Sequence, residues 1–232
     1  MQYIDFVKNT NHLNITNLIE RIDTNKVINE ICDVKFHEER NQKAVDIGVD
    51  ANISGQNNWS SFTLFSKSGK SSDTISQGIT LNENKESYKQ SLRNLRTHQW
   101  TEVANQFPYT VRWIQDNLCP YIKLSYVKIA KLGPGGHVPE HNDKPNVSTA
   151  NMETHSYDML NTILIELTGQ DDLYVTHDGK QLKYKAGDIY WINVAKNHEV
   201  KNNSDSDRYN IRIHGLYNTK FREMIKKCYM IK

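Results

Sequence analysis

The chain has 232 residues, a formal net charge of +2, and charges of both signs interspersed without a run of five like residues. Proteins that bind nucleic acids or membrane surfaces usually concentrate one sign of charge. We therefore expect a small-molecule or peptide partner, and neither a nucleic-acid nor a membrane partner. A chain of this length buries one sizeable core, which predicts a single globular unit.

The cysteines Cys32, Cys119 and Cys228 lie far apart in the sequence. Their odd number and the lack of a Cys-X-X-Cys spacing indicate neither a disulfide framework nor a zinc site, so we expect a reducing compartment. Asp5 stands where a signal peptide would be apolar, and no later segment approaches the apolar length of a membrane span. These observations predict a soluble, cytoplasmic protein.

The sequence pattern in the first half of the chain predicts mostly helices. Apolar residues recur at helical spacing from Asn14 to Cys32, which predicts two short helices, and Pro108 begins another helix that ends at Cys119. A β-prone run covers Trp59 to Phe65, and a thin apolar stripe from Asn82 to His98 predicts a surface helix. We expect residues 1–120 to form a helical and β elaboration that packs on a barrel.

The second half of the chain predicts that barrel. From residue 121 the apolar residues follow a period of two, and short strands then alternate with turns such as Asp178-Gly179 and Ala186-Gly187. We predict strands at residues 121–132, 137–141, 159–167, 173–176, 181–185, 188–193, 199–202 and 209–216. The expected fold is mainly β with flanking helices, on a double-stranded β-helix (jelly roll, cupin-like) core over residues 121–217. Residues 218–232 should form a C-terminal helix or tail.

The most informative segment runs from Gly133 to Asp143 and reads Gly-Pro-Gly-Gly-His-Val-Pro-Glu-His-Asn-Asp. His141 and Asp143 lie two residues apart at the end of a strand, so both side chains point to the same face. His198 follows 55 residues after Asp143, near the start of a later strand. Two imidazoles and one carboxylate form the facial triad that holds Fe(II) and leaves positions open for cosubstrate and oxygen. The sequence thus predicts an iron site made by His141, Asp143 and His198.

Each candidate ligand also has a plainer interpretation. A lone histidine is more often a satisfied surface or core residue, and Asp143 before Lys144-Pro145 is also a turn signal. His37-Glu38-Glu39 is a rival His-X-carboxylate, which we interpret as a solvated charged stretch because it precedes the barrel strands. His137 should share the inward face with His141, where a structural role is favoured over contact with substrate.

Arg208 lies ten residues after His198, at the start of the last strand. Its guanidinium can form a two-pronged ion pair with a carboxylate, as a 2-oxoglutarate site requires for the far carboxylate. Arg212 lies on the same face of the strand and competes for this role, the alternative being an outer-sheet charge. Residues 144–155 form either a lid or a surface insertion, and the sequence favours neither.

Several short segments together resemble one known family. They are the run from Gly133 to Asp143, Ala186-Gly187-Asp188, Trp191-Ile192-Asn193, Asn197-His198-Glu199-Val200 and Asp207-Arg208. With them, the block from Tyr126 to Leu216 resembles the aspartyl/asparaginyl β-hydroxylase family of Fe(II)/2-oxoglutarate-dependent dioxygenases. The resemblance implies that His141, Asp143 and His198 bind iron and that Arg208 anchors 2-oxoglutarate.

Two features refine this resemblance. The animal members lack the carboxylate ligand, whereas Asp143 is present, so the chain resembles the bacterial hydroxylases of free amino acids, such as proline hydroxylases, at least as closely. A basic residue that family members carry on the third strand is replaced in the region of Asn161 and Thr162, either of which can still hydrogen-bond the cosubstrate. We also expect Tyr126, His137, His155 and Trp191 on the substrate side.

The implied reaction is hydroxylation of an unactivated C–H bond by O2, coupled to decarboxylation of 2-oxoglutarate to succinate. Halogenation is less favoured, because related halogenases vacate the carboxylate position that Asp143 fills. Three hypotheses follow: a hydroxylase of a free amino acid or similar metabolite, a hydroxylase of an Asp-, Asn- or Pro-type residue in a peptide or protein, and a non-oxidative cupin that binds metal or sugar. Arg208, at the interval after His198 that a 2-oxoglutarate site requires, argues against the non-oxidative cupin.

Overall fold

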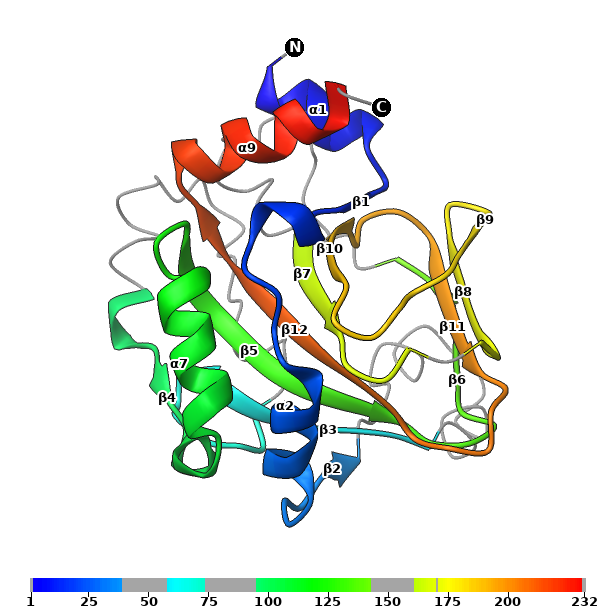
Figure 1. Ribbon diagram of the computed structural model, residues 1–232. Coiled ribbons are helices and arrows are strands. Elements are labelled where there is room, and N and C mark those ends of the chain that lie inside the picture. Colours follow the sequence, from blue (N-terminus) through cyan, green and yellow to red (C-terminus); the bar gives the residue numbers. More distant parts are fainter. Residues whose placement is uncertain (1, 39–57, 74–94, 143–160, 170, 231–232) are drawn as a thin grey trace.

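The computed structural model describes residues 2–38, 58–73, 95–142, 161–169 and 171–230. In this part of the chain, two antiparallel sheets form the body of the protein (Figure 1). The larger sheet has the strand order β1-β10-β7-β12-β5-β3-β2, with β4 paired to β3, and the smaller has the order β6-β11-β8-β9. The larger sheet contains β1 (His12–Asn14), β2 (His37–Glu38), β3 (Trp59–Ser66), β4 (Gln99–Trp100), β5 (Ile122–Leu132), β7 (Asn161–Glu166), β10 (Ile189–Asn193) and β12 (Arg208–Tyr217). The smaller contains β6 (His137–His141), β8 (Leu173–His177), β9 (Lys180–Leu182) and β11 (His198–Asn202).

This architecture confirms the expected mainly β, jelly-roll class, and each of the eight predicted strands is present. Most ends agree within one or two residues, whereas the strand predicted at 181–185 covers only Lys180–Leu182. Both predicted turns are confirmed by backbone with positive φ, at Asp178 (52°), Gly179 (75°) and Gly187 (80°). Side chains disfavour this left-handed region, which explains glycine at two of the three positions.

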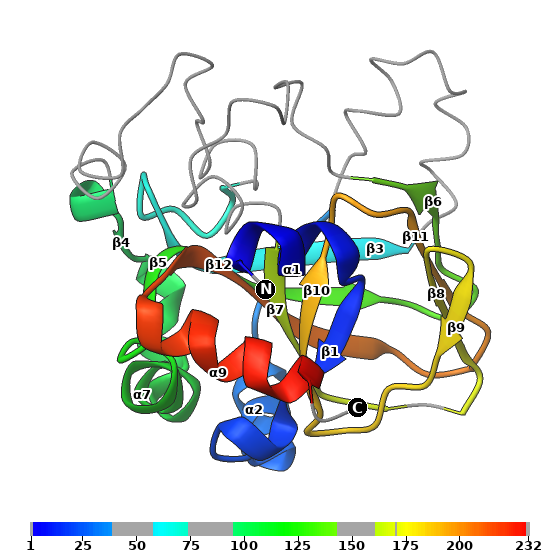
Figure 2. The same cartoon turned by 90° about the horizontal axis from the view of Figure 1, so that it is seen from above.

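Helices flank the sheets. They are α1 (Tyr3–Asn9), α2 (Thr24–Ile31), α7 (Pro108–Asn117) and α9 (Thr219–Met230), with 3-10 turns at Thr16–Leu18, Leu95–Thr97 and Glu102–Gln106. Helices α2 and α7 lie beside each other over one side of the larger sheet, and α1 and α9 lie together near both termini (Figures 1 and 2). Within the described residues, no helix is both long and apolar enough to cross a membrane.

The helix predictions were partly right. The second helix predicted before Cys32 is α2, whose N-cap Asp23 accepts hydrogen bonds from two backbone N–H groups. The first is wrong: after the edge strand β1 the chain forms only the 3-10 turn Thr16–Leu18, because hydrogen bonds to Ile189 of β10 continue through Ile15 and Thr16. The helix begun by Pro108 is α7, as predicted. Most of the stretch predicted as a surface helix at 82–98 lies outside the described residues.

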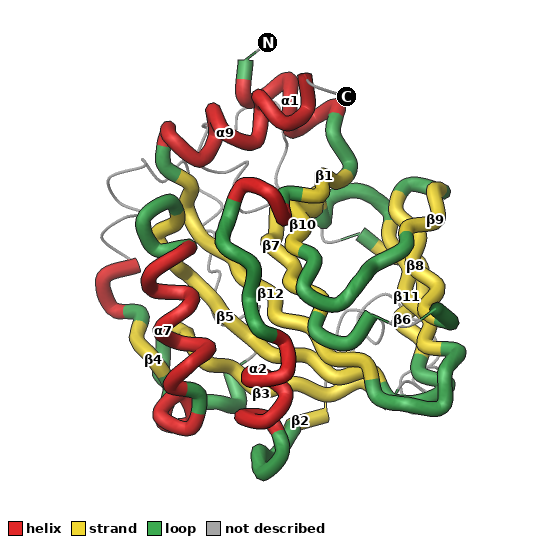
Figure 3. Tube along the Cα trace, viewed as in Figure 1, coloured by secondary structure: helices red, strands yellow, loops and turns green. Residues whose placement is uncertain are grey.

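The larger sheet, whose strands are among those drawn in yellow in Figure 3, carries buried apolar side chains on both of its faces. One face, with Ile163, Ile211 and Trp191, packs against the helices. The other face contributes Leu132, Leu164 and Ile192 to a second cluster shared with the small sheet. We call this second side the inner face, because it looks into the space between the two sheets. Any ligand held between the sheets must contact inner-face residues.

Candidate metal centre

His141 and His198 meet on the inner face of the small sheet. They are direct partners across β6 and β11, and their ring centroids lie 4.2 Å apart. The register of these strands shifts between His198 and Val200, because β6 carries one extra residue there. This bulge lets His141 point inward together with His198, although Val138, three residues earlier, also belongs to the inner cluster.

The hydrogen bonds of the two imidazoles fix which nitrogen can bind a metal. Nδ1 of His141 lies 2.7 Å from the carbonyl oxygen of Pro139, and Nδ1 of His198 lies 2.9 Å from that of Lys196. A carbonyl oxygen only accepts, so each Nδ1 carries the proton and donates it. In a neutral ring, Nε2 then carries the lone pair that a metal requires, and this is the usual support for metal-binding histidines.

The third predicted ligand, Asp143, lies outside the described residues. Among the residues that the structure does describe, no group of three or more His, Cys, Asp or Glu side chains is arranged to hold a metal ion. His141 and His198 offer two imidazole nitrogens at one edge of the inner face. An iron site here fits these residues if the carboxylate two positions after His141 completes the set.

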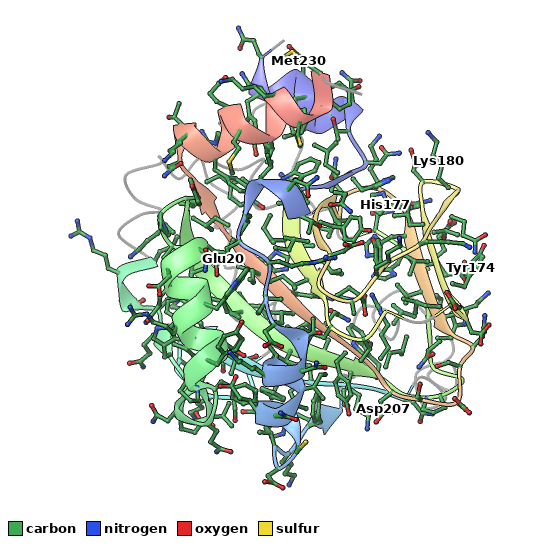
Figure 4. The ribbon with its side chains drawn as sticks, in the orientation of Figure 1. Glu20, Tyr174, His177, Lys180, Asp207 and Met230 are labelled. Carbon is green, nitrogen blue, oxygen red and sulfur yellow. The ribbon has the colours of Figure 1, made fainter. Side chains whose placement is uncertain are left out.

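His177 extends the row of histidines across the small sheet. It is the direct partner of His198 on β8, its ring stacks on that of His198 at 5.9 Å, and His12 of β1 meets it edge-on at 6.0 Å. Figure 4 shows His177 on the inward side of the small sheet, with Tyr174 at the outer edge. Burial, followed by the proximity of His198 and His12, lowers the pKa of His177 to about 4. The ring is therefore neutral at physiological pH.

Arg208 is buried and already holds a carboxylate. Its Nη2 lies 2.6 Å from Oε2 of Glu166, and its Nε lies 3.1 and 3.3 Å from the two Glu166 oxygens. The side chains are 2% and 0% exposed. The phenol ring of Tyr184 covers the guanidinium at 5.9 Å, and burial raises the pKa of that phenol. The residue thus faces the interior, as predicted, in a closed ion pair.

A second pair of cations lies further along the same face. Lys128 of β5 and Arg212 of β12 are direct partners, and both lie over the indole of Trp59, at 5.0 and 5.8 Å. Lys128 is 1% exposed, and Nε of Arg212 donates to Oδ1 of Asn210 at 3.2 Å. Arg212 therefore lies on the inner face and is not the outer-sheet charge that we considered.

The structure places the other predicted site residues on different sides. Tyr126 and Thr162 belong to the inner face, where the Tyr126 hydroxyl is 2.8 Å from Thr63 Oγ1. Asn161 alternates with Thr162 and so points to the helix side. His155 lies outside the described residues.

Two of the substrate guesses lie away from the histidine pair. Trp191 is fully buried on the helix side, where its ring is 5.1 Å from that of Phe6. His137 lies on the outer face of the small sheet, with its Nε2 2.7 Å from Glu199. The expectation that His137 and His141 share a face is wrong, because the bulge between them inverts the alternation. The rival segment at His37-Glu38 is strand β2 at the edge of the larger sheet, not a plain solvated stretch.

Sequence reasoning missed Lys128, Trp59, Glu166 and His177. The period of two that predicted β5 and β7 also assigned Lys128 and Glu166 to a face, and His177 follows Leu173 and Val175 on the inner side of β8. The missing signal was the pairing between strands. Only the register brings Glu166 to Arg208 and Lys128 to Arg212.

Two facing sheets with a pair of metal-competent imidazoles between them define a jelly-roll protein with a candidate metal centre. A family model described as aspartyl/asparaginyl beta-hydroxylase matches residues 21–214. The chain therefore belongs to the aspartyl/asparaginyl β-hydroxylase family, and it is a hydroxylase-type oxygenase. A comparison with curated proteins gave no match.

Solved structures with partial similarity include cupins and a non-heme monooxygenase. A cupin protein from Bacteroides fragilis is 24% identical over 40% of this chain and 67% of its own, with a TM-score of 0.30. A cupin domain from Bordetella pertussis Tohama I is 18% identical over 39% of this chain and 79% of its own, with a TM-score of 0.29. The non-heme monooxygenase ThoJ, in its nickel complex, is 15% identical over 50% of this chain and 54% of its own, with a TM-score of 0.33. The matched region thus spans about half of ThoJ.

Proposed function

We propose that the chain is an Fe(II)- and 2-oxoglutarate-dependent dioxygenase that hydroxylates an unactivated C–H bond of a free amino acid or similar small metabolite. One observation carries the proposal: His141 and His198 meet on the inner face with each Nδ1 held by a backbone carbonyl. Two neighbouring imidazoles with their Nδ1 atoms held in this way keep Nε2 for a metal, and a facial triad requires two such nitrogen ligands. Family membership supports hydroxylase chemistry at that point.

The residues have distinct roles in this proposal. His141, His198 and Asp143 would hold the iron, and the bound iron, 2-oxoglutarate and O2 would supply the oxidising chemistry that yields succinate, carbon dioxide and a hydroxylated product. Pro139 and Lys196 orient the imidazoles through their carbonyls. The apolar inner cluster excludes water from the reacting atoms, which protects reactive species from side reactions.

Arg208 is the proposed anchor for the far carboxylate of 2-oxoglutarate, under one condition. Glu166 already occupies the guanidinium, so a second carboxylate must displace Glu166 or share the donors. Thr162 on the inner face is a further candidate for contact with the cosubstrate.

A hydroxylase of a residue within a peptide or protein is the second candidate. The family description names aspartyl and asparaginyl groups, which favours such side chains as substrates. Release of succinate separates the two: free amino acids should stimulate it under our proposal, and only peptides under the alternative. Metal-replete protein that never consumes 2-oxoglutarate with either panel would indicate a non-oxidative cupin.

The metal assignment is tested without turnover. Anaerobic protein with Fe(II) and 2-oxoglutarate should show the weak visible charge-transfer band of a keto acid chelated to iron. His198→Ala and Asp143→Ala should each weaken the band, whereas Asp207→Asn, at the residue before β12 that pairs with Lys131, should not. A band of parental intensity in His198→Ala would contradict the site.

A further inference from the structure

We propose that His177 is a positioning residue for the metal centre, because its imidazole stacks on that of His198 and holds that ring in place. The inference rests on the proposed function, which makes His198 a metal ligand. Three observations carry it: the contact between the two rings, the backbone that keeps them opposite each other, and the close enclosure of the His177 ring.

His177 meets the His198 ring from the neighbouring strand. The two residues are direct partners across β8 and β11, so their Cβ atoms are about 5 Å apart. The ring centroids lie 5.9 Å apart with an angle of 21° between the planes, which is the range of offset-stacked aromatic pairs. A nearly parallel ring at this distance limits how far the His198 ring can tilt toward β8.

His198 is held from three directions. Its Nδ1 donates to the carbonyl of Lys196, and its ring meets that of His141 at an angle of 52°. His141 and His177 contact His198 from opposite sides, because β11 runs between β6 and β8. The hydrogen bond is a single point of attachment, about which a ring can still rotate. His177 restricts this rotation on the side away from His141.

The backbone keeps the two rings opposite each other. The pairing of β8 with β11 is regular along the whole of β11, whereas the pairing of β11 with β6 shifts after His198. One residue beyond the regular ladder, the N–H of Asp178 donates to the carbonyl of Asn197 at 2.7 Å. This bond closes the ladder directly beside the two histidines. The β8 side of β11 therefore fixes the position of its first residue.

The His177 ring is itself closely enclosed. The residue is 1% exposed, and the ring of His12 on β1 meets it edge-on at 6.0 Å. Figure 4 shows His177 on the inward side of the small sheet, away from solvent. A side chain packed on several sides changes its rotamer only together with its neighbours. His177 can therefore pass its fixed position on to His198.

The nitrogens of the His177 ring contribute little to this support. Both are buried, and neither makes a hydrogen bond within the described residues. The backbone of Asn193 lies near enough to oppose the fall in the pKa of His177, but by less than burial lowers it. The flat shape of the ring, rather than its polar atoms, thus holds His198. A flat ring without nitrogen should replace it.

The first arm of the test uses metal-free full-length protein and observes the His198 ring by NMR. The Nδ1–H proton, assigned by its loss in His198→Ala, should give a resolved resonance, because the hydrogen bond to Lys196 slows its exchange with water. His177→Asn keeps a nitrogen near the position of Nδ1 but removes the ring, and it should broaden the resonance beyond detection. His177→Phe keeps a flat ring and should preserve the resonance.

Tyr174→Asn is the matched control. Tyr174 is also an aromatic residue of β8 paired with β11, but it lies opposite Lys201 on the outer face. Its loss should therefore leave the His198 resonance unchanged. Equal broadening in Tyr174→Asn and His177→Asn would mean that any weakening of β8 disturbs His198, and it would overturn the proposal.

The second arm measures the affinity for Co(II) by the visible absorption of the bound ion. His177→Asn should weaken Co(II) binding roughly tenfold or more, as the loss of groups that orient a metal ligand typically does. His177→Phe and Tyr174→Asn should bind Co(II) like the parent. Circular dichroism confirms that each variant is folded. If His177→Phe does not fold, the difference between His177→Asn and Tyr174→Asn decides.

The two arms fail separately. A missing resonance in the parent, a parental resonance in His177→Asn, or its loss in folded His177→Phe would overturn the positioning role. Parental Co(II) affinity in His177→Asn would also overturn it, and so would an equal loss in His177→Asn and His177→Phe, because His177 would then act through a nitrogen. Parental Co(II) binding in His198→Ala would instead reject the metal assignment, and the first arm would still decide whether His177 holds the ring.

Discussion

The buried ion pair between Arg208 and Glu166 allows a quantitative test of how charge is compensated in this interior. Glu166→Gln keeps the size of the side chain and removes its charge. The guanidinium, 2% exposed at its side chain, would then remain in the interior without its counter-charge. Breaking a buried pair from one side typically costs about 3–5 kcal/mol of folding free energy. That is a large part of the roughly 5–15 kcal/mol that stabilises a typical domain.

Urea unfolding followed by circular dichroism measures the loss. With a slope of about 3 kcal/mol per M, the midpoint should fall by roughly 1 M or more. Asp116→Asn is the control, because it breaks the exposed Arg112–Asp116 pair, whose side chains are 76% and 53% exposed, and should cost less than about 1 kcal/mol. The double variant Glu166→Leu with Arg208→Met should recover most of the loss. A Glu166→Gln protein within about 1 kcal/mol of the parent would refute the reasoning.

Three further predictions use other parts of the fold. Because Glu166 competes for the proposed anchor, Glu166→Gln should tighten 2-oxoglutarate binding in the charge-transfer titration, and weaker binding would count against Arg208 as the anchor. Trp191→Ala should destabilise the protein by about 3–5 kcal/mol, since the side chain is fully buried. Trp191→Phe should leave the affinity for substrate unchanged, and a selective loss of that affinity in Trp191→Phe would restore a substrate role for Trp191. Saturation with Co(II) at about one hundred times its dissociation constant should add about 3 kcal/mol of stability, and His141→Ala should abolish the gain; an equal gain in that variant would place the metal elsewhere.

The sequence predicted the barrel well, because each of its strands depends on a local pattern. The period of two after Pro120 and the turns at Asp178-Gly179 and Ala186-Gly187 are determined by residues next to one another, and the strands follow them closely. Edge strand β1 was missed because its three residues, His12–Asn14, carry no apolar pattern of their own, and only their pairing with β10 defines the strand. The burial of both faces of the larger sheet also hid which side of each strand looks inward.

The candidate site was predicted in part for the same reason. His141 and His198 come together as expected, since strand ends and spacing suffice to place them. The engagement of Arg208 by Glu166 depends on the packing of β12 beside β7, across 42 residues of sequence, and no local pattern reveals it. Likewise His137 appeared to share a face with His141 because alternation was counted without the bulge.

That extra residue in β6 has a consequence for how the protein tolerates changes in length. In a regular strand, His141 would sit on the same side as His137, against solvent and Glu199. Loss of one residue between Val138 and His141 would remove the bulge and place the histidine two residues after Val138, where its imidazole still faces inward opposite His198. One residue between Val138 and the histidine in a regular strand, or the present two residues in a bulge, both bring the imidazole to the inner face, so the pairing with His198 determines its orientation.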